Sequence, residues 1–408
     1  VLCTGHLWPQ EHEGTIPGYF DSPYPPQKLS RVFDHPVALR GASLTAIDAV
    51  RTLSRAHGEF VRDAGNTLRY LPDPNYPHFK IVMHSREGFL PGIRFHLEDP
   101  RLSQKCLLSV FALARHRKEN DGFISLDYLF DHDFKQRFRE SEPGFYAQIE
   151  SLKLEEFVEQ MMKERERTDA FTFFKREYSE AAASIRNEES ILWKEKLAVL
   201  SYALNHPAKY LSAEDTLRLR RVLAPLISVV IAFAPQRSCE ELIALHDAGR
   251  LDMVAVGTSS WVEPQQSGGV VYHYLNDGRD ERVPFPTFVD CTGQSHLSYE
   301  EFPFPSLKAD GTVSRALIRF RSRVEAEREA EDPSLRIVIA DSDCYLQVPG
   351  IAIGDEFQVV NEDGSLSDCI FNMAGPLMGG HNPDYSGLDF CEEAAKKIVG
   401  ELSRLIQF

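Results

Sequence analysis

The chain has 408 residues, enough for a large hydrophobic core and for more than one domain. Its 43% hydrophobic and 26% charged residues are ordinary for a soluble globular protein, and no apolar run approaches the roughly 20 residues that span a bilayer. The formal net charge of −16 argues against sequence-independent nucleic-acid binding, which needs a basic surface.

The seven cysteines are scattered, odd in number and never in CxxC spacing, which argues against a zinc site and against a disulfide framework. The histidines form no HxH or HExxH motif, so we expect no metal site. The cysteine pattern indicates a reducing, cytoplasmic location.

The chain opens Val-Leu-Cys-Thr-Gly, without an initiator methionine or a signal peptide, and these residues are typical of the end of a strand. We therefore expect that upstream coding sequence is absent.

The first dinucleotide-like pattern follows a loop-rich start. Residues 1–35 are rich in proline, glycine and aromatic side chains, which is typical of an ordered loop. A short strand is predicted at 36–39, and a helix at 44–56 has apolar residues at Leu44, Ile47, Val50 and Leu53. Another strand is predicted at 80–84.

The middle of the chain predicts helices and the last third returns to strands. Residues 102–116 and about 150–234 are rich in charged residues with helical apolar spacing, so we expect a helical insertion at about 150–235. Later strands are predicted at 252–256, 270–275, 287–290, 336–340 and 351–353. A final helix is predicted at about 390–406, with an apolar stripe close to 3.6 periodicity.

The turn between the predicted strand at 36–39 and the helix that follows carries the first chemical signal. Gly41, Ser43 and Ala46 stand where a dinucleotide-binding GxGxxG motif has glycines. Small residues there let a pyrophosphate approach the backbone N–H groups of a helix N-terminus. An ordinary strand–turn–helix corner explains the same residues about as well.

The second signal is the end of the strand predicted at 80–84, which is followed by Ser85 and Arg86. In dinucleotide-binding modules this strand end meets the adenosine ribose, where an acidic residue suits NAD and an arginine suits the 2′-phosphate of NADP. The sequence therefore favours NADP over NAD. A surface arginine without a ligand is the alternative.

A short internal repeat is the third signal. Val1-Leu2-Cys3-Thr4-Gly5 recurs as Val289-Asp290-Cys291-Thr292-Gly293. Two copies of one strand-end pattern suggest two similar dinucleotide modules, although a chance pair is an alternative. A fourth pattern, a strand ending in Gly354-Asp355 and followed by Gly380-His381, suits a flavin ribityl chain. Taken alone, it is better explained as the loop-rich end of a domain.

These motifs together resemble the two-dinucleotide FAD/NAD(P)-binding flavoproteins related to the flavin-dependent N-hydroxylating monooxygenases. The matching segments run in a consistent order along nearly the whole chain: Thr4-Gly5-His6, Ser22 to Pro25, Gly41 with Leu44 to Asp48, Ser85 to Pro91, Asp290 to Gly293, Gly354-Asp355, and Ser386 to Cys391. The resemblance is specific as to family and weak as to substrate.

The resemblance implies an α/β fold of two Rossmann-type modules with a helical insertion. It implies that residues 1–35 are a remnant of the FAD-binding domain, 36–300 the NAD(P)-binding domain and 301–408 the C-terminal part of the FAD-binding domain. Residues implied at the nicotinamide dinucleotide are Gly41, Ser43, Leu44, Thr45, Ser85 and Arg86. Residues expected near the flavin or at the repeated turn are Gly5, His6, Thr292, Gly293, Gly354, Asp355, Gly380 and His381.

The expected activity is therefore hydride transfer from NADPH to FAD, with a small-molecule substrate, no nucleic acid and no membrane partner. We name no catalytic residue, because flavin chemistry does not demand a side-chain acid or base. The sequence departs from the family at residues 1–35, which lack the GxGxxG motif that binds FAD. Two alternatives stay open: a non-catalytic dinucleotide-binding or assembly protein, and a split flavoenzyme whose partner chain carries the missing segment.

Overall fold

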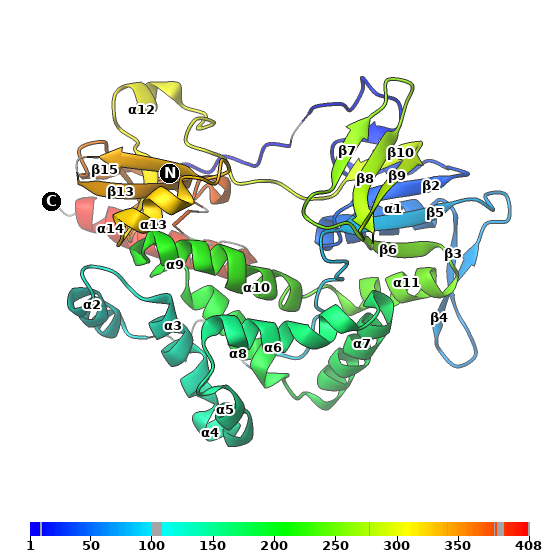
Figure 1. Ribbon diagram of the computed structural model, residues 1–408, viewed down its shortest axis with the longest axis horizontal. Coiled ribbons are helices and arrows are strands. Elements are labelled where there is room, and N and C mark those ends of the chain that lie inside the picture. Colours follow the sequence, from blue (N-terminus) through cyan, green and yellow to red (C-terminus); the bar gives the residue numbers. More distant parts are fainter. Residues whose placement is uncertain are drawn as a thin grey trace.

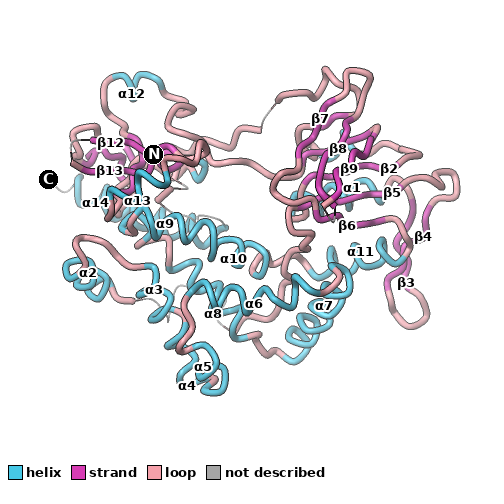
Figure 2. The backbone as a smooth tube through the Cα atoms, in the orientation of Figure 1, coloured by secondary structure: helices cyan, strands magenta, loops and turns pink. Residues whose placement is uncertain are grey.

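The computed structural model describes residues 1–8, 10–98, 108–276, 278–340, 342–378, 380–381 and 387–406. Two lobes stand side by side above a block of helices (Figures 1 and 2). We name them the sheet lobe (described residues of 16–98 and 234–293), the helical block (110–230) and the C-terminal lobe (1–4 and described residues of 297–406). Two chain segments, the described residues of 5–15 and residues 294–296, cross between the lobes.

The sheet lobe is built on five parallel strands in the order β1-β10-β2-β5-β6. Their bounds are β1 (Tyr19–Phe20), β2 (Pro36–Arg40), β5 (Lys80–Ser85), β6 (Leu251–Ala255) and β10 (Thr287–Asp290). The chain passes from β2 outward to β5 and β6, and β10 joins the opposite side of β2. The sheet therefore has a topological switch point between β2 and β10, where ligands of open α/β sheets bind.

Alternating side chains of β2 pack against two different layers. Val37 and Leu39 join the core formed with the helices α1 (Leu44–Arg55) and α11 (Gln236–Asp247), whereas Ala38 faces the three-stranded antiparallel sheet on the other side. This alternation follows from the period of two in a strand. The antiparallel sheet consists of β7 (Trp261–Pro264), β8 (Val270–Asn276) and β9 (Arg279–Phe285).

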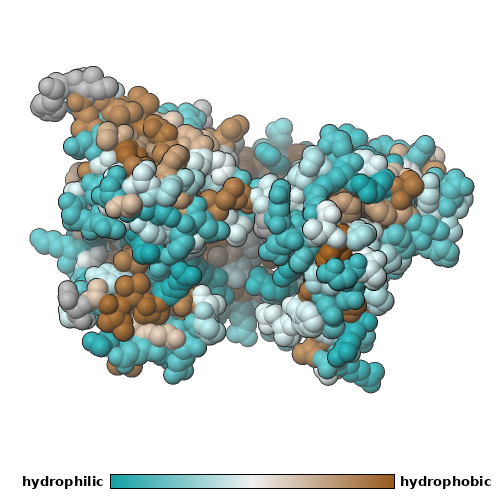
Figure 3. Space-filling model, turned by 90° about the horizontal axis from the view of Figure 1, so that it is seen from above, coloured by the Kyte–Doolittle hydropathy of each residue, from teal (hydrophilic) through white to brown (hydrophobic). Residues whose placement is uncertain are grey.

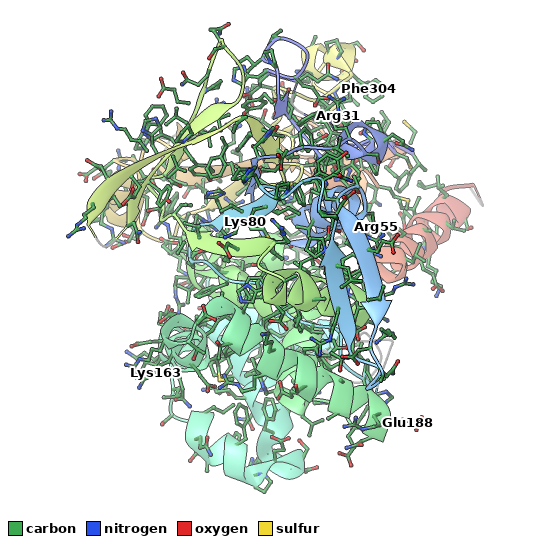
Figure 4. The ribbon with its side chains drawn as sticks, turned by 90° about the vertical axis from the view of Figure 1, so that its right-hand side faces the viewer. Arg31, Arg55, Lys80, Lys163, Glu188 and Phe304 are labelled. Atoms are coloured by element: carbon green, nitrogen blue, oxygen red, sulfur yellow. The ribbon has the colours of Figure 1, made fainter. Side chains whose placement is uncertain are left out.

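A hairpin of β3 (Gly58–Arg62) and β4 (Leu68–Pro72) extends from the same lobe beside α11. In the side view of Figure 4, Arg55 and Lys80 lie on this lobe, and Lys163 and Glu188 lie on the helical block below it. The structure confirms, within two residues, the strand predicted at 36–39, the helix predicted at 44–56 and the strand predicted at 80–84.

Along the chain, the helical block lies between β5 and α11, which precedes β6. It begins at Val110, ahead of the 150 expected from sequence, because α2 and α3 pack into the same core as the later helices. Four phenylalanines, Phe130, Phe134, Phe138 and Phe157, form the centre of that core. The elements are α2 (Val110–Glu119), α3 (Leu126–Asp133), α4 (Phe138–Ser141), α5 (Pro143–Ile149), α6 (Leu154–Arg167), α7 (Ala170–Asn187), α8 (Leu192–Ala203), η3 (Ala208–Tyr210), α9 (Ala213–Arg218), a π-helix η4 (Leu219–Leu223) and α10 (Ala224–Val230).

The C-terminal lobe contains antiparallel sheets covered by helices. One sheet has the order β11-β13-β12 and the other pairs β14 with β15. The bounds are α12 (Pro305–Ala309), β11 (Arg315–Arg319), α13 (Arg323–Glu329), β12 (Arg336–Ala340), β13 (Asp343–Ile351), β14 (Gln358–Val360), β15 (Leu366–Phe371) and α14 (Gly387–Ile406). The fold is thus mixed α/β with one parallel sheet. Among the described residues, a second Rossmann-type sheet is not formed.

Residues 1–35 are divided between the two lobes. Leu2 forms a parallel bridge with Asn372 in the C-terminal lobe, whereas Tyr19 and Phe20 pair with β10 in the sheet lobe. The segment expected to be one remnant of an FAD-binding domain thus contributes to both lobes. Tertiary pairing with Phe288 and Val289, far along the chain, places β1 in the sheet lobe.

Candidate functional site

A cavity of about 560 Å³ lies in the sheet lobe where β2, β5, β6 and β10 end. Residues that directly follow these strands line it, including Gly41, Arg86, Val256 and Cys291. The volume is within the range of about 300–1,000 Å³ that small-molecule sites occupy. The cavity thus stands at the carboxyl edge of the parallel sheet, beside the switch point between β2 and β10.

Gly41 makes the turn from β2 into α1 at the wall of this cavity. Its φ is 113°, in a region that L side chains rarely adopt, and its N–H donates to the His84 carbonyl at 2.7 Å. A Cβ on Gly41 would lie 2.7 Å from the Cys291 carbonyl oxygen. Glycine is therefore required here for both conformation and space.

The N-terminus of α1 points its first backbone N–H groups toward the same region. Ser43 is the N-cap residue, but its side chain forms no capping hydrogen bond, and the first turn contains no acidic residue. An uncapped N-terminus of a twelve-residue helix is suited to an anion. Ser43 lines the cavity; Leu44 and Thr45 follow in the first turn without lining it.

Ser85 and Arg86 line the cavity, and β5 ends at Ser85, within one residue of the predicted strand end. Arg86 is 68% exposed, and its Nε lies 3.9 Å from Glu87, too far for a strong ion pair. Arg40 also lines the cavity, and its Nη1 is 3.5 Å from Asp290. Two guanidinium groups are thus placed at the cavity with only weak carboxylate partners.

Thr292 and Gly293 lie at the end of β10, opposite Gly41. The backbone N–H and the hydroxyl of Thr292 both donate to Asp290 Oδ1, at 2.9 and 2.6 Å, which closes a tight turn. Thr292 lines the cavity, and Gly293 lies next to Thr45. The second copy of the internal repeat therefore does form part of the cavity wall.

A stacked pair that sequence reasoning missed also lines the cavity. His84 stacks on Tyr272 of β8, with 4.2 Å between ring centroids, and its Nδ1 lies 3.1 Å from the Leu39 carbonyl oxygen. Burial lowers the pKa of His84 to about 4, so the ring is neutral and its Nδ1 donates to the carbonyl. No local pattern pairs these two residues, because β5 and β8 meet only in the tertiary structure.

The remaining predicted residues lie away from this cavity. Gly354 follows β13, and a cavity of only about 50 Å³ lies beside it and Asp355. Asp355 accepts hydrogen bonds from Tyr210, at 2.9 and 3.0 Å, and its Oδ1 is 2.5 Å from Lys209 Nζ. The predicted strand at 351–353 is the end of antiparallel β13 followed by a bridge from Ile353 to Val359.

Gly380 and His381 are packed into the C-terminal lobe. A Cβ on Gly380 would lie 2.7 Å from the Pro349 carbonyl oxygen. His381 is 7% exposed, burial lowers its pKa to about 3, and among the described residues neither ring nitrogen has a hydrogen-bond partner. Gly5 and His6 lie on the first crossover and are exposed. Within the described residues, these positions do not enclose a space that fits a flavin.

Two kinds of feature are absent from the described residues. No group of three or more histidine, cysteine, aspartate or glutamate side chains is arranged to hold a metal ion. No helix in the described part of the chain is long and apolar enough to cross a membrane.

Comparison with known proteins matches the helical block and much of the rest of the chain. Residues 110–231 match the family model of the YdhS-like middle domain. The chain is also 26% identical over 309 residues to the protein named "Uncharacterized protein YdhS" of Escherichia coli (strain K12). The match covers 76% of this chain and 56% of that protein, so the chain spans about half the length of this relative.

Proposed function

We propose that this chain belongs to an FAD-dependent NAD(P)H oxidoreductase and that its sheet-lobe cavity binds NADP(H). The observation that carries the proposal is the convergence of Gly41, the uncapped N-terminus of α1 and the ends of four parallel strands on one cavity. A pyrophosphate needs backbone N–H donors and enough room to approach them closely. The strand–turn–helix at this cavity offers both.

Each group at the cavity has a role in this proposal. The N-terminus of α1, which reaches the cavity at Ser43, would bind the pyrophosphate, and Gly41 would leave room for it. Ser85 and Arg86 would bind the adenosine end, with Arg86 favouring a 2′-phosphate because an arginine carries a full charge and several donors. The neutral His84 and Tyr272 would form the floor beneath the ligand.

The flavin part of the proposal rests on the family resemblance of the motifs. FAD would accept the hydride from NADPH and pass electrons on, either to O₂ as in a monooxygenase or to another acceptor. Because Gly354, Asp355, Gly380 and His381 do not fit a flavin within the described residues, we assign no step to them. A separate chain or a further segment that completes the flavin site is part of the proposal.

Titration calorimetry with NADP⁺ and NAD⁺ tests the dinucleotide site. We expect NADP⁺ to bind more tightly, and Arg86→Ala to weaken NADP⁺ binding by about tenfold, the effect of one charge-assisted hydrogen bond, while NAD⁺ binding changes little. Arg237→Ala is the matched control, because Arg237 is 81% exposed on α11 and does not line the cavity. If neither dinucleotide binds, the proposal is wrong.

An anaerobic absorption spectrum tests the redox function. The protein is mixed with FAD, freed of excess flavin and titrated with NADPH. Bleaching of bound flavin supports an oxidoreductase. Dinucleotide binding without flavin uptake would instead indicate a non-catalytic dinucleotide-binding protein.

A further inference from the structure

A second cavity, of about 310 Å³, lies on the antiparallel sheet of β7, β8 and β9, at the margin of the sheet lobe (Figure 1). The inner face of this sheet is apolar, since Val270, Tyr272 and Phe285 pack in one core with Phe288 of the parallel sheet. Side chains alternate along a strand, so the residues between them point outward. Most of the cavity wall comes from two cross-strand rows on that outer face, namely Trp261, His273 and Arg282, and Leu275 with Asp280.

Trp261 gives this cavity a flat apolar surface that is held in place from behind. The indole stacks on the His273 imidazole, with 3.9 Å between ring centroids and 3° between the planes. His273 is itself fixed, because its Nε2 lies 2.8 Å from Glu263 Oε2. Trp261 is still 52% exposed, and it stands on the edge strand β7, so the side of the indole away from His273 is open. A ring that is already oriented loses little conformational freedom when a ligand packs on it.

Charged groups of both signs line the same cavity. Asp280 and Arg282 lie two residues apart on one face of β9, and neither side chain forms an ion pair or a hydrogen bond with another described residue. A simple anion would meet the carboxylates of Asp280 and Glu281, and a simple cation would meet the Arg282 guanidinium. The lining therefore favours a neutral ligand that donates and accepts hydrogen bonds at neighbouring atoms.

The surface around this part of the molecule suits a small ligand better than a protein partner. Seen from above, the hydrophobic residues of the sheet lobe are dispersed among hydrophilic ones (Figure 3). Protein partners usually bind a continuous apolar patch. A zwitterionic amino acid would also match a carboxylate and a guanidinium, but Asp280 and Arg282 are exposed, where pairs of full charges contribute little. It would also make no use of the flat indole.

We propose that this cavity binds a sugar ring. Neighbouring hydroxyl groups of the sugar donate to the Asp280 carboxylate and accept from the Arg282 guanidinium, while its C–H face packs on the open side of the Trp261 indole. The site is separate from the sheet-lobe cavity, although one loop serves both: Thr258 and Ser260 line the first cavity, and Ser259 lines the second. The two cavities have no lining residue in common, so the proposal does not depend on the proposed function.

Saturation-transfer NMR on the whole chain tests this site, with glucose, galactose and ribose as neutral probes and glycine as the zwitterionic one. We expect at least one sugar to bind and glycine not to bind. Trp261→Ala should weaken the binding of that sugar by about tenfold, the effect of losing one aromatic stacking contact. Arg282→Gln should also weaken it. Arg279→Gln is the matched control, because Arg279 is exposed on the same strand and does not line the cavity.

Circular dichroism establishes that each variant is folded, and Asp280→Asn replaces Trp261→Ala if the latter is not, with weaker sugar binding again expected. A sugar that bound in the sheet-lobe cavity would be unaffected by Trp261→Ala and would be displaced by NADP⁺, so the two locations are distinguishable. The proposal is overturned if none of the three sugars binds, if glycine binds in their place, or if the variants at positions 261 and 282 keep the wild-type affinity.

Discussion

Lys209 of the helical block and Asp355 of the C-terminal lobe form an ion pair, with 2.5 Å between Nζ and Oδ1. The lysine side chain is only 10% exposed and the aspartate 45%. Burial raises the pKa of Asp355, but Lys209 and the Tyr210 hydroxyl outweigh it, so the pKa is lowered. This contact joins two parts of the chain that no local sequence pattern connects.

Replacing Asp355 with asparagine should leave the Lys209 charge nearly buried without a counter-charge. We expect a loss of about 1–3 kcal/mol in the free energy of unfolding, below the cost of breaking a fully buried pair because Asp355 is partly exposed. Urea denaturation measures it. Asp252→Asn is the control, since Asp252 pairs with Lys80 at the surface (Figure 4) and its loss should change stability little. Equal effects of both variants would contradict the prediction.

Alanine at position 41 should disturb the turn at the sheet-lobe cavity. The positive φ and the approach of the Cys291 carbonyl oxygen predict a loss of more than about 2 kcal/mol in unfolding free energy, and weaker NADP⁺ binding. Denaturant unfolding and calorimetry measure the two effects. Gly144→Ala is the matched control, because a Cβ there meets no atom within 4 Å. A stable Gly41→Ala protein would show that the turn tolerates a side chain.

Acid should destabilise the fold through His84. Its pKa is about 4 in the folded chain and 6.5 unfolded, so below pH 6.5 the unfolded state binds a proton that the folded state excludes. The contribution of the neutral ring to the free energy of unfolding is therefore complete above pH 6.5, and it is lost as the pH falls toward 4. The difference of 2.5 units (6.5 − 4) corresponds to about 3 kcal/mol.

Unfolding free energies at pH 7.5 and 4.5 test this, with His84→Phe expected to reduce the difference between them. Phenylalanine keeps the stack on Tyr272 but cannot titrate. His78→Phe, at an exposed position, should retain the wild-type difference. The prediction fails if His84→Phe and wild type lose the same stability on acidification.

Glu177 should be essential to the centre of the helical block. It is 6% exposed and binds two cations, Arg165 at 2.7 Å and Lys194 at 3.1 Å. Glu177→Gln leaves the buried Arg165 without a carboxylate, whereas Lys194 keeps Glu180 at 2.9 Å, so we expect a loss of about 3 kcal/mol. Glu164→Gln is the control, since Glu164 is 67% exposed beside Arg176. A two-state urea curve measures each variant, and a change below about 1 kcal/mol for Glu177→Gln would contradict the prediction.

The ion pairs of Glu177 also connect to the sheet-lobe cavity, through Arg165. Arg165 Nη1 donates to the Leu90 carbonyl at 3.1 Å, and Leu90 lines the cavity. Arg165→Met should therefore weaken NADP⁺ binding even though Arg165 does not line the cavity itself. Calorimetry on the folded variant measures the affinity for NADP⁺. An unchanged affinity would show that the segment around Leu90 holds its position without this hydrogen bond.

The sequence by itself determined the local elements of the sheet lobe and half of its candidate site. The strand at 36–39, the turn at Gly41, the helix from Leu44 and the strand ending at Ser85 are governed by neighbours a few residues apart, through side-chain periodicity and the conformational freedom of glycine. These short-range rules also place Ser43 just before the helix and Arg86 just after a strand.

Only the tertiary structure decided the rest. The pairing of β1 with β10, the stack of His84 on Tyr272 and the ion pair of Lys209 with Asp355 each join residues that are far apart in the chain. Such contacts depend on which faces the folded core brings together, and local periodicity carries no information about them. For the same reason, the sequence gives no indication that Asp355 pairs with Lys209.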